Sequence, residues 1–374
     1  MVRCQTGFLA RKGLVKEMTA SDRLAEMLRL SPKTGVVIHD PSNIFYLTEG
    51  YAGEGLVYIT AERRVIITDF RYVEAAGKAA PAFEVVVTSH DRQQTKCVAE
   101  LCAADGVTEL RFESNYLPVD AFEKLRAAVG EEVSYVPLKQ APQTLRQVKT
   151  PAEIVTMRKA AAITSEAFEA VLAKIHPGMT ETELRLELEN TMYRLGAEAL
   201  AFDTIIASGE NGSLPHAVPG SRKLQKGDMI TMDFGAKVGG YCSDMTRTVA
   251  LGEPSAEMRK VYQTVLRAQA MCEAALAAGK NCFEIDRLAR DYIDSQGYAG
   301  RFGHGLGHCV GIDIHEDPRL SPSCHDTLKA GMVITVEPGV YLPGIGGVRI
   351  ENTCLVKENG SEPLTTARKE LVVL

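Results

Sequence analysis

Short apolar runs and longer periodic segments alternate along the first part of the chain. Runs rich in β-branched residues predict strands, and amphipathic spacing predicts helices: strands at 35–39, 56–60, 64–68 and 83–88, helices at 69–79 and 120–129. We therefore expect a small α/β N-terminal domain over residues 18–140. Because it has no Gly-rich phosphate loop and no cluster of metal-ligating side chains, we expect it to support the fold, set specificity or mediate dimerisation.

The pattern changes to long helices after residues 136–148, which contain two prolines and are predicted to be a linker. Thr150 with Glu153 forms a capping box that opens a helix, and Thr180 with Glu183 opens a second one. A second domain is therefore expected over residues 150–374.

This second domain contains an internal repeat in which two helices are followed by a strand and a hairpin. Residues 224–235 align without a gap on 328–339, at an offset of 104 residues, with five of twelve positions identical. Polar positions coincide as well: Asp233 with Glu337 and, after three extra loop residues, Asp244 with Glu351 and Thr246 with Thr353. The repeat predicts a pseudo-twofold domain in which four acids converge.

The four acids are expected to lie among apolar neighbours on two hairpins. If the first turn is centred on Val238–Gly239, Asp233 and Asp244 are cross-strand neighbours with Cβ atoms about 5 Å apart. Glu337 and Glu351 repeat the arrangement. Like charges there destabilise a hairpin, and shifted pKa values, an organic cation or metal ions could each resolve the conflict. Two divalent cations balance four carboxylates, and metal ions about 3.5–4 Å apart form a known hydrolytic arrangement.

A nitrogen ligand is available in the glycine-rich segment 301–308. Its glycines argue against a helix, and in a strand His304 and His308 point to the same face. Oxygen ligands with one imidazole favour Mn²⁺, with Co²⁺, Fe²⁺ or Zn²⁺ as alternatives.

Composition narrows the class of protein. The net charge of −6 without a basic run removes the usual attraction to nucleic acid or to an anionic membrane, and no apolar run reaches about 18 residues. Residues 1–17 hold four basic side chains but no apolar core, so we expect a frayed start and no secretory signal, with the fold beginning near Met18. Nine cysteines without a CxxC pair predict free thiols in a reducing cytoplasm.

Five residues, Asp233, Asp244, His308, Glu337 and Glu351, resemble the metal ligands of the prolidase, aminopeptidase P and methionine aminopeptidase superfamily. The resemblance covers residues 150–374 and extends to the motifs around the ligands: Leu214-Pro-His216-Ala, Gly303-His304-Gly-Leu-Gly-His308, Asp313-Ile-His315-Glu and Gly347-Val-Arg349-Ile-Glu351. The segment Pro41-Ser-Asn-Ile-Phe-Tyr-Leu-Thr48 resembles the N-terminal domain of proline peptidases and creatinase, which methionine aminopeptidases lack.

The resemblance implies an α/β N-terminal domain followed by an α+β pita-bread catalytic domain with an internal pseudo-twofold repeat. It also implies two divalent metal ions per chain, with Mn²⁺ the first choice. Asp233 would chelate one ion, Asp244 and Glu351 would bridge both, and His308 and Glu337 would complete the other.

The remaining roles also follow from the resemblance. The metals would lower the pKa of a bridging water toward about 7, and Glu337 would act as general base as well as ligand. His315 would donate to the oxygen of the tetrahedral intermediate, and His216 would contact the substrate around the scissile bond. Arg349 would fix the bridging carboxylates, and His304 would either orient its neighbours or contact substrate.

The implied activity is release of an N-terminal residue that precedes proline. Compact length and the loop 208–216 favour the aminopeptidase P type, which accepts longer peptides, over the prolidase type, which accepts dipeptides. The implied partners are small peptides with proline in second position and a second copy of the chain in a homodimer. A creatinase-like hydrolase and an inactive binding module are the alternatives, but both should have lost metal ligands that this chain retains.

Overall fold

The computed structural model describes residues 18–374, which divide into two compact units on either side of Lys139–Gln140. The expectation of a frayed start without a secretory signal concerns residues 1–17 and lies outside the described residues. No helix in the described range is both long and apolar enough to cross a bilayer.

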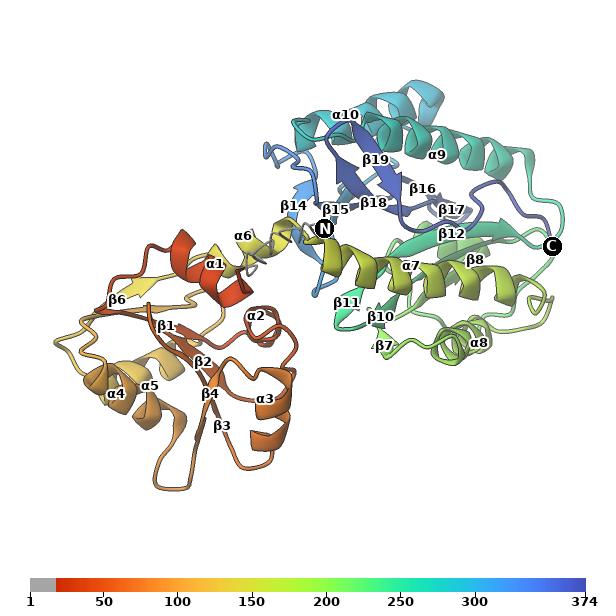
Figure 1. Cartoon of the computed structure of the whole chain (residues 1–374). Coiled ribbons are helices and arrows are strands. Elements are labelled where there is room, and N and C mark those ends of the chain that lie inside the picture. Colours follow the sequence, from red (N-terminus) through yellow and green to blue (C-terminus); the bar gives the residue numbers. More distant parts are fainter. Residues whose placement is uncertain (1–17) are drawn as a thin grey trace, which may run out of the picture. The chain divides into compact units, whose positions relative to one another are not determined.

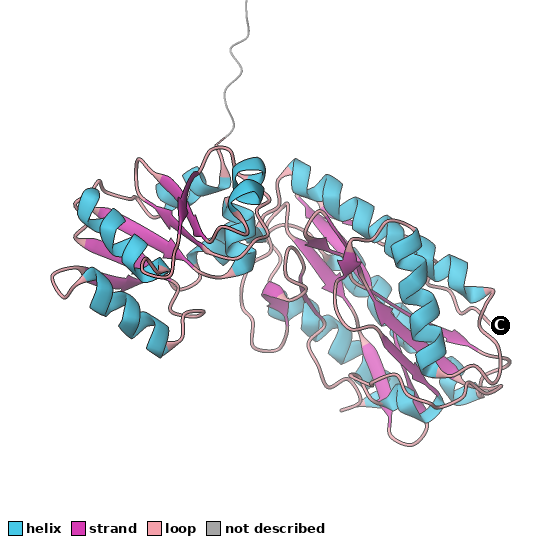
Figure 2. Cartoon of the chain, turned by 90° about the horizontal axis from the view of Figure 1, so that it is seen from below, coloured by secondary structure: helices cyan, strands magenta, loops and turns pink. Residues whose placement is uncertain are grey.

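The first unit is built on one six-stranded sheet in the order β4-β3-β2-β1-β5-β6. Its elements follow the chain as α1 (Ala20–Met27), β1 (Thr34–Ile38), α2 (Pro41–Leu47), β2 (Leu56–Ile59), β3 (Arg64–Thr68), α3 (Val73–Ala79), β4 (Glu84–Val87), α4 (Gln94–Ala104), β5 (Glu109–Phe112), α5 (Val119–Val129) and β6 (Ser134–Pro137). β1 pairs antiparallel with β2 and parallel with β5. Figure 2 shows helices on both faces of the sheet, so the central strands β1, β2 and β3 are buried on both sides, whereas the edge strands β4 and β6 are partly exposed.

The strands and helices predicted in this unit are confirmed, and the boundary between the units falls inside the predicted linker 136–148, but that stretch has regular structure. β6 lies at the start of the stretch 136–148, and α6 (Ala141–Gln147) opens the second unit. Pro142 falls in the first turn of α6, where a missing backbone N–H leaves no hydrogen bond unmade. Pro142 therefore marks the beginning of a helix, whereas Pro137 ends β6, and Arg146 on that helix is buried.

The second unit consists of helices and strands in two similar halves. Its elements are α6, α7 (Pro151–Leu172), α8 (Glu181–Arg194), β7 (Ala199–Leu200), β8 (Ile205–Ser208), the 3₁₀ helix η1 (Gly209–Ser213), β9 (Met229–Phe234), β10 (Ala236–Val238), β11 (Tyr241–Cys242), β12 (Met245–Ala250), α9 (Ala256–Ala275), α10 (Cys282–Ile293), the π-helical turn η2 (Asp294–Tyr298), β13 (Gly307–Cys309), β14 (Glu316–Leu320), β15 (Val333–Val336), β16 (Gly339–Leu342), β17 (Gly346–Arg349), β18 (Asn352–Lys357) and β19 (Gly360–Pro363).

The predicted repeat is visible in the strand pairing of these halves. In the first half β9 lies between β8 and β12, and in the second half β15 lies between β13 and β18, all antiparallel. Figure 1 shows α7 and α8 along one side of the strands and α9 and α10 along the other. Each helix pair buries its own half-sheet in a separate apolar cluster. The polar ends of both hairpins are therefore left to meet at the centre.

Both predicted capping boxes are present. Thr150 Oγ1 accepts from Glu153 N at 3.3 Å while the Glu153 carboxylate accepts from Thr150 N at 2.8 Å. Thr180 and Glu183 repeat this reciprocal pair at the start of α8. Each box satisfies two backbone N–H groups that a helix start leaves free.

The predicted register of the first hairpin is wrong by two residues. The turn is formed by Gly239 and Gly240, whose φ angles of 53° and 78° suit a tight two-residue turn, and Asp233 pairs with Thr246 instead of Asp244. Because side chains alternate with a period of two, a shift of two leaves Asp244 on the same face as Asp233.

Candidate metal centre

The four predicted acids come from the places where the two hairpins bend. Asp233 lies near the end of β9 and Asp244 just before β12. Glu337 follows β15 and Glu351 precedes β18, next to the strand pair Val336–Asn352. Asp244 and Glu351 are buried, with 5% and 1% of their surface exposed. All four line one cavity of about 480 Å³. The repeat thus delivers the predicted convergence of acids.

Two equivalent threonines lock the halves together at this point. Thr246 Oγ1 donates to Glu351 Oε2 at 2.7 Å, and Thr353 Oγ1 donates to the backbone oxygen of Asp244 at 2.7 Å. Each threonine therefore reaches across to the acid of the other half, as a pseudo-twofold arrangement requires.

His308 on β13 provides the nitrogen ligand. Its Nδ1 lies 3.1 Å from the backbone oxygen of Cys309, so Nδ1 carries the proton and Nε2 presents a lone pair. Nε2 lies 3.5 Å from Asp244 Oδ2 and 3.5 Å from Glu337 Oε1. Burial lowers the pKa of His308 to about 3, which keeps the ring neutral and able to bind a metal ion.

The electrostatics of the acids are unfavourable without a cation. Burial, reinforced by the charges of the neighbouring acids, raises the pKa of Asp244 and Glu337 well above the usual range of a carboxyl group. Burial and then the charge of Asp233 raise the pKa of Glu351 to about 8. In the described part of the chain, Asp233 Oδ1, Asp244 Oδ1 and Glu351 Oε1 are buried without a hydrogen-bond donor.

These residues fit a divalent metal ion. Asp244, His308 and Glu351 each place a ligand atom within 4.8 Å of the others. Hard oxygen ligands with unused lone pairs, joined by one neutral imidazole, suit divalent ions of the Mn²⁺ class. A cation of this kind would be coordinated by the three carboxylate oxygens that lack a hydrogen-bond donor among the described residues, and its charge would offset the repulsion among the acids.

Three further histidines predicted at the site, His216, His304 and His315, line the same cavity. The His315 ring lies edge-on to His308 with 4.5 Å between centroids, and burial lowers its pKa. His304 Nδ1 lies 2.8 Å from the Gly305 oxygen and Nε2 lies 2.8 Å from the Tyr341 hydroxyl. Burial lowers the pKa of His304 to about 4, so the ring is a neutral acceptor for Tyr341.

Arg349 differs from its expected role of contacting the bridging acids. Its Nη2 donates to Asp233 Oδ2 at 2.6 Å, and it reaches Glu351 only through Thr246, whose Oγ1 accepts from Nε at 3.2 Å. Its Nη1 donates to the Tyr341 hydroxyl at 2.9 Å. The chain of hydrogen bonds from Asp233 through Arg349 and Tyr341 ends at His304.

Sequence reasoning missed two members of the site. Tyr341 is buried behind Arg349 and has no motif around it. Arg319 lines the cavity, its side chain is 53% exposed, and the nearest carboxylate, Asp317, lies 4.0 Å from its Nε. Its position on β14, directly opposite His308, is the signal that strand pairing would have provided.

Comparison with known proteins reveals similarity over both units. Residues 155–358 match metallopeptidase family M24, and residues 22–148 match the creatinase/prolidase N-terminal domain. An uncharacterized peptidase of Bacillus subtilis, YqhT, is 38% identical over 91% of this chain and 96% of its own length. An Xaa-Pro dipeptidase from Bacillus anthracis superposes with a TM-score of 0.90 at 38% identity, covering 95% of this chain and 99% of that one. An X-Pro aminopeptidase from Thermotoga maritima superposes with a TM-score of 0.88 at 32% identity, covering 94% and 100%. The predicted two-domain architecture with mixed α/β content is thereby confirmed.

Proposed function

Because this chain belongs to metallopeptidase family M24 and carries the creatinase/prolidase N-terminal domain, we propose that it hydrolyses the bond between an N-terminal residue and a following proline. The observation that carries the proposal is the buried cluster of four acids and His308, in which three carboxylate oxygens have no donor among the described residues. Such a cluster suits metal-assisted hydrolysis better than a structural role.

Each residue of the cluster would have a separate role in hydrolysis. Asp233, Asp244, His308, Glu337 and Glu351 would hold two divalent ions, which lower the pKa of a bound water and supply a nucleophile near neutral pH. Glu337 lines the cavity beside His308 and would accept the proton of the attacking water on its carboxylate.

Two histidines would act on the substrate itself. His315 is neutral because burial lowers its pKa, and its N–H would donate to the oxygen that gains charge as the peptide bond is attacked. His216 would contact the substrate around the scissile bond from the loop 209–219.

The proposed domains are residues 18–140 for the N-terminal domain and residues 150–374 for the catalytic domain.

Arg319 favours a second candidate, the prolidase type. The sequence favours an aminopeptidase that accepts longer peptides, but a cation in the cavity suits the free carboxylate that only a dipeptide presents next to the scissile bond. The Arg319 guanidinium is half exposed, and its nearest carboxylate is not closer than 4.0 Å. We therefore infer that Xaa-Pro dipeptides are the better substrates.

The identity of the metal, the assembly and the compartment belong to the same proposal. Mn²⁺ is supported by the oxygen-rich ligand set. A reducing cytoplasm is supported by eight free cysteines in the described chain, seven of them buried. A homodimer is expected from the family resemblance.

The decisive assay compares an Xaa-Pro dipeptide with an Xaa-Pro-Xaa tripeptide on Mn²⁺-loaded protein, with a chelator control. We expect hydrolysis of both to need metal, and the dipeptide to be preferred. Arg319→Gln should reduce dipeptide turnover more than tripeptide turnover, whereas Arg287→Gln, an exposed arginine on α10, should change neither. Preference for the tripeptide in the wild type would restore the aminopeptidase assignment, and activity on neither would refute the proposed function.

A further inference from the structure

His216 has no anchor of its own in the cavity. It lies on the loop 209–219, which leads from β8 toward β9, and its side chain is exposed. Among the hydrogen bonds of residues 18–374, none involves its ring. The position of the ring relative to the acids must therefore be set by the backbone of the loop.

Both ends of this loop are attached to the carboxylate of one buried residue, Glu181. Its Oε1 accepts from Ser208 N at 2.8 Å and from Ser208 Oγ at 2.7 Å. Its Oε2 accepts from Gly220 N at 3.2 Å, and Asn211 Nδ2 lies 3.1 and 3.2 Å from the two oxygens. The residue is fully buried. One carboxylate thus closes the loop that carries His216.

The capping of α8 does not require Glu181. Thr180 and Glu183 already form the capping box of that helix, and Glu181 points away from the box toward the loop. A carboxylate has two oxygens that can each accept several hydrogen bonds, and those of Glu181 are all directed at donors of the loop and its ends. The arrangement serves the loop and not the helix.

The middle of the loop is tied to the acid cluster. Gly212 packs against the backbone of Gly347 on β17, and Arg349 Nη1 donates to the oxygen of Pro215 at 3.3 Å. Because the same arginine binds Asp233, the residue before His216 is coupled to a predicted metal ligand. The backbone around His216 is therefore held at three places, by Glu181 at both ends of the loop and by Arg349 at Pro215.

We propose that Glu181 is a positioning residue for peptide hydrolysis, which fixes His216 in the cavity by holding both ends of the loop 209–219. The claim that Glu181 affects hydrolysis rests on the proposed function. The claim that Glu181 holds the loop 209–219 does not, and it can be tested without measuring turnover.

The kinetic test is a double-mutant cycle between Glu181→Gln and His216→Ala in the Mn²⁺-loaded protein. Gln keeps the size of the side chain but loses acceptor capacity, and we expect kcat/KM to fall about 10- to 100-fold with metal content unchanged. In the His216→Ala background the same change should have almost no further effect. Glu183→Gln, two residues along the same helix, is the matched control and should leave kcat/KM as it is. Losses that multiply in the double variant would overturn the proposal.

The structural test is amide hydrogen exchange over the loop 209–219. Glu181→Gln should speed exchange in the loop and leave exchange in the rest of the second unit unchanged. If Glu181→Gln fails to fold, Asn211→Ala replaces it and should speed loop exchange more weakly. If the wild type hydrolyses neither peptide but the variant shows faster loop exchange, the proposed function is refuted, while the role of Glu181 in holding the loop is supported. Unchanged loop exchange would overturn the assignment whatever the activity.

Discussion

Asp244 is a carboxyl group on which burial and the charges of neighbouring acids act together. Its Oδ1 has no donor in the described chain, and three other acids share the cavity with it. We expect Asp244→Ala to abolish turnover and lower the metal content while the protein still folds. Because the substitution removes one of four mutually repelling acids, the metal-free variant should melt no lower than metal-free wild type.

The measurement combines turnover, bound metal and thermal unfolding in chelator. Asp291→Ala, at an exposed position on α10, is the control and should change none of the three. Full peptide hydrolysis by Asp244→Ala would contradict the assignment of the centre.

His315→Ala separates transition-state stabilisation from metal binding. The ring lies beside His308 without replacing it as a ligand, so we expect roughly 10²- to 10³-fold loss of kcat with both metals retained. His325→Ala, on a ring that packs against Phe283, should leave kcat unchanged. Loss of metal from His315→Ala would show that the residue has been assigned the wrong role.

At the scale of single residues, the acids could be predicted because their chemistry conflicts with their neighbours. Charged side chains at apolar strand positions demand a partner, and the repeat doubled that signal. Tyr341 and Arg319 could not be predicted, since a tyrosine or an arginine on a strand is unremarkable until pairing brings it to the cavity. The contacts of Arg349 depend on the same non-local pairing.

At the scale of elements, Glu316 ties α6 to β14. Its carboxylate accepts from Arg146 Nη2 at 2.5 Å and from Lys149 Nζ at 3.0 Å, and all three side chains are at most 7% exposed. Burial opposes ionisation, but Lys149 and Arg146 hold the pKa of Glu316 below its usual value. Glu316→Gln would remove the charge that the buried Arg146 and Lys149 share, so we expect the free energy of unfolding to fall by about 3–5 kcal/mol.

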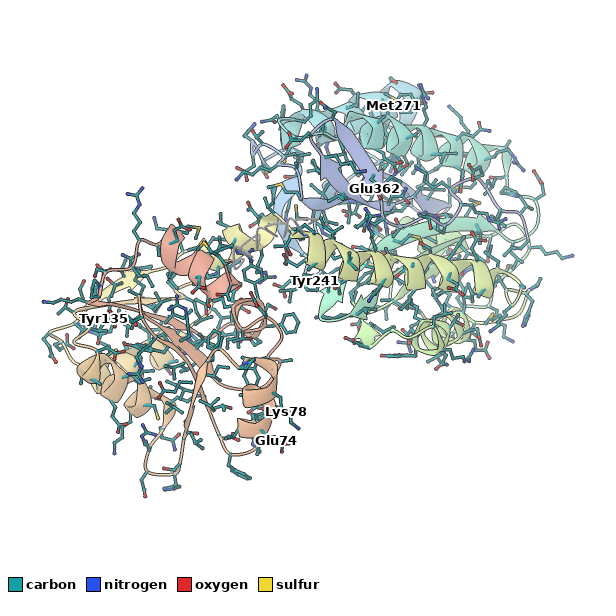
Figure 3. All side chains as sticks on the ribbon, in the orientation of Figure 1. Glu74, Lys78, Tyr135, Tyr241, Met271 and Glu362 are labelled. Carbon is teal, nitrogen blue, oxygen red and sulfur yellow. The ribbon has the colours of Figure 1, made fainter. Side chains whose placement is uncertain are left out.

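Glu362 on β19, labelled in Figure 3, provides the matched control. It also bridges two cations, Arg158 and Lys357, but its side chain is 30% exposed. Solvent screens such a pair, so Glu362→Gln should cost less than about 1 kcal/mol. Urea unfolding of both variants makes the comparison, and equal losses would argue against burial as the cause.

Helix starts could be predicted because their sequence signals are local, whereas the pairing register of the first hairpin could not. Capping boxes at Thr150 and Thr180 fix helix starts from four neighbouring residues, which is why both predictions are confirmed. The first hairpin offered two adjacent glycines after Val238, and only the structure shows that both adopt positive φ in the turn. The helix within the stretch 136–148 was not predicted because Pro142 suits both a linker and a helix start.

For the whole molecule, the repeat was the most informative property of the sequence. It predicted two equivalent halves whose acids meet, which the crossed contacts of Thr246 and Thr353 confirm. The sheet order of the first unit, β4-β3-β2-β1-β5-β6, was beyond prediction because it mixes parallel and antiparallel neighbours far apart in sequence.

The stability of the whole molecule should respond to pH in a direction set by the centre. Burial and the charge of Asp233 raise the pKa of Glu351 from 4.5 to about 8. A carboxyl group whose pKa is raised by folding stabilises the fold below its unfolded pKa, and this contribution is lost as the pH rises through about 8. Buried histidines act in the opposite sense, since burial lowers the pKa of His39, His304 and His308, and the unfolded state still loses part of its histidine charge between pH 7 and 8. Buried cysteines act in the same sense as the acids, because burial raises the pKa of thiols such as Cys242 and Cys272 to about 12.

Comparing metal-free with Mn²⁺-bound protein from pH 7 to 8 therefore isolates the acids, because His39 and the buried cysteines contribute equally in both conditions. In chelator, we expect the free energy of unfolding to fall across this window by up to about 1.4 kcal/mol per pH unit for each acid that titrates there. With Mn²⁺ bound, the ligands stay deprotonated in the folded state, so the free energy should fall less steeply across the window and lie above the metal-free value. Urea titrations at pH 7.0, 7.5 and 8.0 in each condition measure the difference, within about 0.5 kcal/mol. Metal-free protein that gains stability toward pH 8 would mean that the acids are already ionised without a cation, and the electrostatic argument for the centre would fail.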